Sequence, residues 1–165
     1  MLYISFYPSP LGRITMASDG THLTGLWFED QAHYGAGLAE NVQIAELPVF
    51  FDTRNWLDAY FSGEIPKAHP PIRLTGTPFR MAVWQILQKI PYGETMTYGQ
   101  IARILARERG VAKISAQAVG GAVGHNPISL IVPCHRVVGS DGSLTGYAGG
   151  IQRKAFLMHL EQSRR

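Results

Sequence analysis

TYGQIARILARERGVAKISAQAVGGAVG, residues 97–124, carries the signals of two short helices in succession. Thr97 is a favoured N-cap for the first helix, and Gly110 is a favoured terminator. Ser115 caps the second helix, which we expect to run to about Val123. Two short helices joined by a tight connection predict a helix-turn-helix.

The second of these helices has almost no large side chains. Its small residues are Ala116, Ala118, Gly120, Gly121, Ala122 and Gly124. Glycine inside a helix costs roughly 1 kcal/mol relative to alanine, so such a run needs a physical reason. Close approach of a DNA backbone is one reason, and tight packing against another helix of the same lobe is the other. The residues alone leave both open.

Upstream, Thr77 and Pro78 predict the start of another helix, because proline is tolerated at the first helical position. Apolar residues at helical spacing continue to Ile90, and Pro91 ends the helix. The proline-rich stretch 64–77 before it is expected to be a stiff linker.

The first part of the chain has a different pattern. We expect a hairpin of strands over 2–7 and 13–17, a third strand over 23–28, a loop over 31–43 and a helix over 49–61. The chain of 165 residues is long enough for one sizeable core or for two small lobes.

The predicted fold class is therefore α+β. It has a small N-terminal lobe of sheet plus helix over 1–72, a linker at 73–77, and a mainly helical C-terminal lobe with the helix-turn-helix over 78–165.

Charge differs between the two halves. Residues 1–77 hold four basic and eight acidic side chains, a net charge of −4, and residues 78–165 hold eleven basic and four acidic ones, a net charge of +7. A basic half suggests a polyanionic partner, most often nucleic acid. An ordinary solvated surface is an equally good interpretation of charge alone.

Several classes of protein are excluded by composition. No run of about 18 apolar residues is present, and the N-terminal sequence lacks the pattern of a signal peptide, so we expect a cytoplasmic protein. The single cysteine, Cys134, excludes an intrachain disulfide and a multi-cysteine zinc site.

Cys134 follows an apolar, strand-like run in residues 126–137, NPISLIVPCHRV. A thiol becomes a good nucleophile only as thiolate, and His135 is a candidate base. Neighbours in an extended strand point to opposite faces, however, so adjacency does not by itself pair the two residues. A buried structural cysteine is the competing interpretation.

Residues 98–161 resemble the O6-alkylguanine-DNA alkyltransferases, also called methylated-DNA–protein-cysteine methyltransferases. The strongest matching motifs are Pro133-Cys134-His135-Arg136-Val137, Gly124-His125-Asn126-Pro127-Ile128 and Gly146-Tyr147-Ala148-Gly149-Gly150. Weaker matches are Gly76-Thr77-Pro78-Phe79, Ile90-Pro91-Tyr92-Gly93-Glu94-Thr95 and Thr97-Tyr98-Gly99. One short motif would be weak evidence, but this ordered set covers about half the chain. The first lobe matches only loosely.

The resemblance implies DNA repair by a stoichiometric, irreversible transfer of an alkyl group from O6 of a flipped guanine to Cys134. His135 resembles the base that removes the thiol proton, acting through a water, and Glu161 the residue that orients the imidazole. Tyr98 is similar to the tyrosine that helps rotate the nucleotide and donates a proton to the departing base. Asn126 matches a hinge between the recognition helix and the active-site turn.

The implied partner is double-stranded DNA containing O6-alkylguanine, bound by a monomer through the minor groove, with no cofactor and no metal. The implied DNA-contacting and base-contacting residues are Gln117, Ala118, Gly121, Ala122, Arg136, Val137, Tyr147 and Ala148. Gln117 stands where the family pattern has an arginine that fills the gap left by the flipped base, and Ala148 stands where some relatives have serine.

Other interpretations compete with this one. A non-catalytic alkyltransferase-like protein would bind lesions without an acceptor cysteine, a helix-turn-helix regulator would bind DNA without chemistry, and a cysteine hydrolase would turn over many times. Each site residue also has an ordinary interpretation when taken alone. Tyr98 and Tyr147 could be aromatic residues of the core. Glu161 could be a solvated helix residue, and Asn126 could be an ordinary turn residue.

Overall fold

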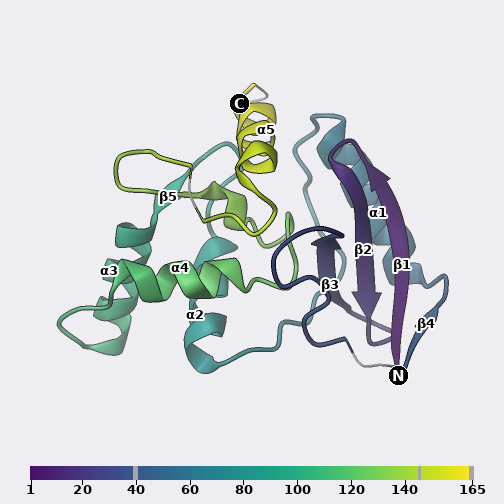
Figure 1. Cartoon of the computed structure of the whole chain (residues 1–165), viewed down its shortest axis with the longest axis horizontal. Coiled ribbons are helices and arrows are strands. Elements are labelled where there is room, and N and C mark those ends of the chain that lie inside the picture. The colour runs from purple at the N-terminus through teal and green to yellow at the C-terminus, as the bar shows by residue number, and fades with distance from the viewer. Residues whose placement is uncertain (39–40, 145, 164–165) are drawn as a thin grey trace.

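The computed structural model describes residues 1–38, 41–144 and 146–163. Two lobes lie side by side, with the sheet of the N-terminal lobe at one end and a group of helices at the other (Figure 1). The α+β class expected from the sequence is confirmed. Among the described residues, no helix is both long and apolar enough to cross a bilayer.

The N-terminal lobe is a four-stranded sheet with one helix. Its elements are β1 (Leu2–Ser9), β2 (Gly12–Ser18), β3 (Leu23–Phe28), β4 (Val42–Ile44) and α1 (Pro48–Phe61). The strand order is β3-β2-β1-β4, with β4 parallel to β1 and the other neighbours antiparallel. The predicted hairpin, third strand and helix are confirmed.

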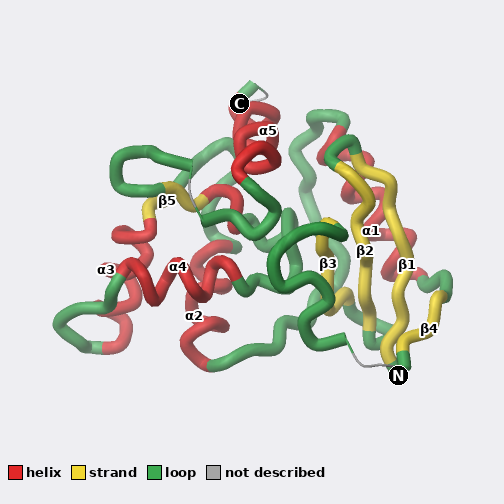
Figure 2. Tube along the Cα trace, in the orientation of Figure 1, coloured by secondary structure: helices red, strands yellow, loops and turns green. Residues whose placement is uncertain are grey.

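The strand β4 was not expected, because residues 31–43 were predicted to be a loop. It has three residues and pairs with Leu2–Ile4 at the edge of the sheet. A strand this short gives too few residues for an alternating pattern to be recognised. Figure 2 shows it as a small yellow segment beside β1.

The C-terminal lobe is mainly helical. Its elements are α2 (Pro78–Leu87), β5 (Met96–Thr97), α3 (Tyr98–Arg109), α4 (Ala116–Gly124), the 3-10 helix η1 (Cys134–Arg136), β6 (Val137–Val138) and α5 (Ile151–Gln162). The expected caps are present: Thr77 accepts from the N–H of Arg80, and Ser115 from that of Ala118. Thr97 forms a reciprocal capping box with Gln100. These caps fix where α2, α3 and α4 begin.

The prediction of a strand leading into Cys134 is wrong. Only Ile128 makes a β-bridge, to Leu26, and Leu130 has a φ of 72°. The side chain of Asn126 closes a turn here, because its Nδ2 donates to the Val132 carbonyl (2.7 Å) and its Oδ1 accepts from the Ile128 N–H (3.0 Å). These side-chain hydrogen bonds replace the ladder that a strand would need.

The two lobes are joined by backbone hydrogen bonds as well as by apolar contacts. The N–H of Leu26 in β3 donates to the Pro127 carbonyl (2.8 Å), and the Leu26 carbonyl accepts from the Ser129 N–H (3.0 Å). The edge of the N-terminal sheet therefore pairs with the turn that precedes the cysteine.

Trp84 connects α2 to α4 and provides a test of the C-terminal core. Its side chain is buried, and Nε1 donates to the Ala122 carbonyl (2.8 Å). We expect Trp84→Phe to lower the free energy of unfolding by about 2 kcal/mol, because it removes both ring volume and a hydrogen bond. Urea unfolding followed by circular dichroism measures this difference. An unchanged midpoint would contradict the packing described here.

Candidate active site

Cys134 is the first residue of η1 and is only 3 % exposed. Burial raises the pKa of its thiol, while a hydrogen bond from the Asn126 side chain and the charge of Lys154 act in the opposite direction. The net effect is a thiol that keeps its proton in the resting protein. Nucleophilic chemistry at this sulfur therefore needs a base.

His135 is fully buried beside the carboxylate of Glu161, with Nε2 and Oε2 2.5 Å apart. Burial lowers the pKa of the imidazole, although Glu161 opposes this effect. A neutral ring in this position carries its proton on Nε2 and donates it to Glu161. Nδ1 is then an unprotonated acceptor, and among the described residues it has no hydrogen-bond partner. It is the ring atom that remains available to take a proton.

Glu161 is 2 % exposed and is surrounded by donors from three segments of the chain. Oε1 accepts from the Gly93 N–H (3.0 Å) and from Arg136 Nε (2.8 Å), and Oε2 accepts from the Tyr60 hydroxyl (2.6 Å) and from His135 Nε2. Burial alone would raise the pKa of this carboxyl, but His135 and Arg136 outweigh that effect and hold it well below its usual range. Glu161 is thus ionised although it is buried.

Cys134, His135 and Glu161 combine a nucleophile, a candidate base and a residue that orients the base. This is the arrangement that activates a weak nucleophile at neutral pH. The described residues contain no group of three or more His, Cys, Asp or Glu side chains that could hold a metal ion.

Both lobes match family models. Residues 2–73 match the ribonuclease-like domain of 6-O-methylguanine DNA methyltransferase, and residues 78–163 match its DNA binding domain. The chain belongs to the 6-O-methylguanine DNA methyltransferase family. The resemblance recognised in the sequence is therefore confirmed, and it extends to the first lobe.

Relatives and solved structures agree with this membership. A methylated-DNA–protein-cysteine methyltransferase of Haemophilus influenzae is 44% identical over 98% of this chain and 87% of its own length. The crystal structure of the Mycobacterium tuberculosis O6-methylguanine methyltransferase has a TM-score of 0.85 at 42% identity, covering 100% of this chain and 95% of that one. The structure of Mycobacterium tuberculosis OGT in complex with DNA also has a TM-score of 0.85, covering 98% and 94%.

Two tyrosines that the family motifs singled out lie around the cysteine. Burial raises the pKa of Tyr98, and a thiolate at Cys134 raises it further. Its hydroxyl lies so close to Gly146 that a Cβ there would approach it to 2.8 Å. Tyr147 is buried with its ring 6.5 Å from that of His135, and its hydroxyl has no hydrogen-bond partner among the described residues.

The predicted DNA-contacting residues of α4 fall on two sides of the helix. Gln117, Ala118 and Gly121 are exposed, and a Cβ added at Gly121 would have open space around it. Ala122 is buried and its carbonyl accepts the indole N–H of Trp84. Its side chain therefore packs within the lobe. For Ala122, the small residue is explained by tight packing against another helix. Only the outer side of α4 is available to a partner.

Other residues that were predicted to contact DNA or the flipped base form hydrogen bonds within the protein. Arg136 donates to Glu161 and to the Ile90 carbonyl (2.7 Å), so its guanidinium is bound within the active site. The Val137 carbonyl accepts from Lys154 Nζ. The Ala148 carbonyl accepts from the N–H of Ala32, in the N-terminal lobe (3.1 Å).

Sequence reasoning missed two buried residues of the site, Lys154 and Tyr60. Lys154 shares a face of α5 with Leu157 and Glu161, and this helical spacing was a usable sign that it lies inside. Tyr60 lies on the apolar face of α1, and no local pattern connects it to Glu161, 101 residues later.

Glu161 makes stability depend on pH in a defined direction. Its folded pKa lies below its unfolded value of about 4.3, so its contribution is present above that pH and is lost as the pH falls toward the folded pKa. We expect Glu161→Gln to lower the free energy of unfolding by about 3 kcal/mol near neutrality, because Arg136 loses its buried counter-charge.

The difference in the free energy of unfolding between wild type and Glu161→Gln should become smaller as the pH is lowered from about 6 to about 3. Urea titrations at each pH measure this difference. Glu108→Gln, on the exposed side of α3, is the control that removes the same charge. A difference that stays constant or widens toward low pH would contradict an ionised Glu161.

Proposed function

We propose that Cys134 is the alkyl acceptor of a DNA repair reaction, in which a methyl or larger alkyl group leaves O6 of guanine for this sulfur. Family membership supports a methylated-DNA–protein-cysteine methyltransferase activity. Such a protein alkylates a cysteine of its own, and Cys134 is the only cysteine among the 165 residues. This single cysteine, followed directly in the chain by a histidine that a carboxylate orients, is the observation that carries the assignment.

The proton balance follows from the protonation states of the resting site. The neutral His135 takes the thiol proton at Nδ1, directly or through a water, and the ionised Glu161 stabilises the imidazolium that forms. The sulfur then attacks the alkyl carbon in line with the C–O6 bond. The C–S bond forms as the C–O6 bond breaks, and the electron pair of the C–O6 bond leaves with the guanine. Tyr98 is the proposed donor of a proton to the departing base.

The reaction ends at a thioether. We propose that this thioether is not cleaved again, so each molecule acts once. We propose that no cofactor takes part, since the thiolate itself is the nucleophile. The less favoured alternative, lesion binding without chemistry, leaves the buried His135–Glu161 pair next to Cys134 without a role.

Access to the sulfur requires movement. Because Cys134 is 3 % exposed, a guanine can reach it only after leaving the duplex stack and after the side chains over the sulfur shift. We propose that Tyr147 and Ala148, with the backbone at Val137, line the pocket that the flipped base then occupies. Extruding a base costs a few kcal/mol, and the cost is lowest at a damaged pair.

DNA is proposed to contact the exposed side of α4 through Gln117, Ala118 and Gly121. Small side chains suit the narrow minor groove. Exposed cations of α3 and the turn after it are placed to contact phosphates: Arg103, Arg107, Arg109 and Lys113. We propose a monomer bound to duplex containing O6-alkylguanine, and the cytoplasmic location stays a prediction.

The acceptor assignment is tested with duplex DNA carrying one O6-methylguanine. We expect one methyl group per protein molecule, found by peptide mass on the fragment that contains Cys134. Cys134→Ala should abolish transfer while still binding the duplex, because α4 is unchanged. Several turnovers per molecule, or a methyl group on another peptide, would refute the assignment.

Gln117 offers a test of the DNA-binding side of α4. Gln117→Arg should tighten binding to damaged duplex roughly fivefold, about 1 kcal/mol, since guanidinium stacks better than an amide and adds charge. Gln43→Arg in β4 is the matched control, because it adds the same charge to an exposed position of the N-terminal lobe. Equal effects of both variants in fluorescence anisotropy would count against insertion of residue 117.

A further inference from the structure

The N-terminal lobe contributes a side chain to the active site. Tyr60, on α1, is fully buried, and its hydroxyl donates to Glu161 Oε2 at 2.6 Å. The same hydroxyl lies 3.4 Å from His135 Nε2. It therefore contacts both the carboxylate and the imidazole.

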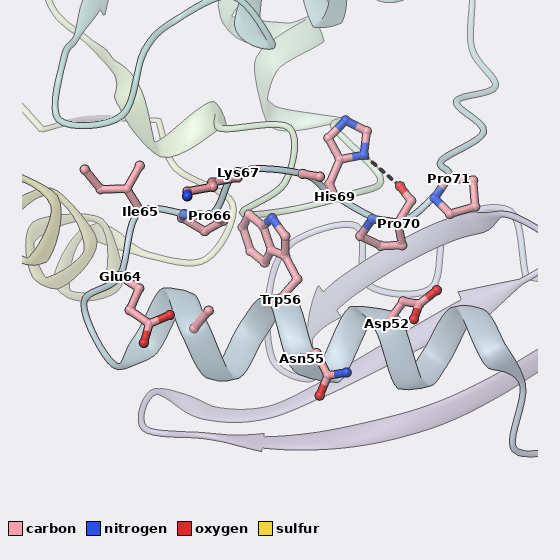
Figure 3. A pocket seen from close by; sticks show the side chains of 12 residues that line it. Asp52, Asn55, Trp56, Glu64, Ile65, Pro66, Lys67, His69, Pro70 and Pro71 are labelled. Carbon is pink, nitrogen blue, oxygen red and sulfur yellow. Dashed lines mark hydrogen bonds between the residues drawn. The ribbon is translucent and has the colours of Figure 1, made fainter.

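Aromatic neighbours fix the position of this hydroxyl. The Tyr60 ring stacks on Trp56 (5.3 Å between centroids, 10° between planes) and meets Phe61, Tyr92 and His135 edge-on. Figure 3 shows Trp56 projecting from α1 toward the segment that holds Pro66 and Lys67. Residues 64–71 of this segment line a cavity of about 500 Å³ together with residues of α1. A ring held on several sides cannot swing its hydroxyl away from Glu161.

We propose that Tyr60 is a positioning residue for the transfer reaction: its hydroxyl, supplied by the N-terminal lobe, holds the Glu161 carboxylate in the orientation that aligns His135 with Cys134. This inference rests on the proposed function, since it assigns a task within that same site. It makes the N-terminal lobe part of the catalytic arrangement.

The hydroxyl also limits how strongly Glu161 attracts the imidazole proton. Oε2 accepts its shorter hydrogen bonds from Tyr60 and His135. Arg136 donates to Oε1 through Nε (2.8 Å) and more distantly to Oε2 through Nη2 (3.3 Å). Without the hydroxyl, Oε2 would accept mainly from His135, and the imidazolium would be favoured. The pKa of His135 would then rise, and the ring would be protonated over more of the working pH range.

Other groups face this pair and stay in place when only the hydroxyl is removed. They are Arg136 from η1, Lys154 from α5, Tyr147, and Tyr92 from the segment after α2. Burial and the charge of Glu161 hold the pKa of Tyr60 far above its usual value, so it remains a protonated donor at every pH used. The direction of the shift is thus set by one hydrogen bond.

Single-turnover transfer measured from about pH 5 to about pH 9 tests this proposal. In Tyr60→Phe we expect the midpoint of the acidic limb to rise by about half a pH unit, which is a roughly threefold slower rate below the midpoint. The fraction of molecules that react should stay unchanged. A merely structural tyrosine would instead lower that fraction and leave the midpoint where it is, which would overturn the proposal.

Tyr7→Phe is the matched control. The Tyr7 hydroxyl also donates to a carboxylate, Asp58 Oδ1 at 2.7 Å, within the same lobe. The pH profile of transfer by Tyr7→Phe should coincide with that of wild type. Substitution of 3-fluorotyrosine at position 60 keeps the shape of the ring and strengthens the donor, so the midpoint should move downward, and this variant also serves if Tyr60→Phe does not fold.

A second readout separates this inference from the proposed function. The pKa of His135 in the unreacted protein is measured by NMR titration of ¹⁵N-labelled imidazole, and it needs no transfer. If wild type fails to transfer the methyl group, the proposed function is wrong, and a rise in the pKa of His135 in Tyr60→Phe still supports the contact. If wild type transfers and Tyr60→Phe matches Tyr7→Phe in both readouts, the inference is overturned.

Discussion

The buried negative charge of Glu161 is the constraint around which both lobes are arranged. Burying a carboxylate costs several kcal/mol unless donors surround it. Here the donors come from α1, from the segment after α2 and from η1, while Glu161 itself lies on α5. Because these donors come from three different parts of the chain, the hydrogen bonds that stabilise the carboxylate also hold those segments together. The same carboxylate then fixes the proton of His135 on Nε2 and leaves Nδ1 as acceptor.

This arrangement explains how a buried thiol can act as the nucleophile of a reaction that each molecule performs once. Burial keeps Cys134 protonated, which limits its loss to oxidants before a substrate arrives. Activation is assigned to His135 instead of to a permanently ionised sulfur. The sheet edge at β3 pairs with the turn that precedes Cys134, and Tyr60 binds Glu161. The N-terminal lobe thus supports the nucleophile's backbone and its base, although its sequence gave little indication of function.

Local signals in the sequence predicted local structure well. The caps at Thr77, Thr97 and Ser115 and the β1–β2 hairpin depend on residues close together in the chain. What local patterns could not show were contacts between distant segments: β4 is defined by its partner strand, and Tyr60 acquires its role only through Glu161. The run before Cys134 was interpreted as a strand because its residues are apolar, whereas Asn126 folds it into a turn through side-chain hydrogen bonds. A family motif assigned Arg136 to DNA contact, and the structure shows it bound to the buried carboxylate of Glu161, while the DNA contact stays a prediction.

The central claim is that His135 rests as a neutral ring with its proton on Nε2. Long-range ¹H–¹⁵N correlation spectra of the ¹⁵N-histidine-labelled protein near neutral pH report both the charge and the tautomer of each of the six histidines, and a His135→Gln sample identifies the signal. The account predicts one protonated and one unprotonated ring nitrogen for His135, with the proton on Nε2. An imidazolium, or a proton on Nδ1, would contradict it, because no acceptor for the thiol proton would then remain.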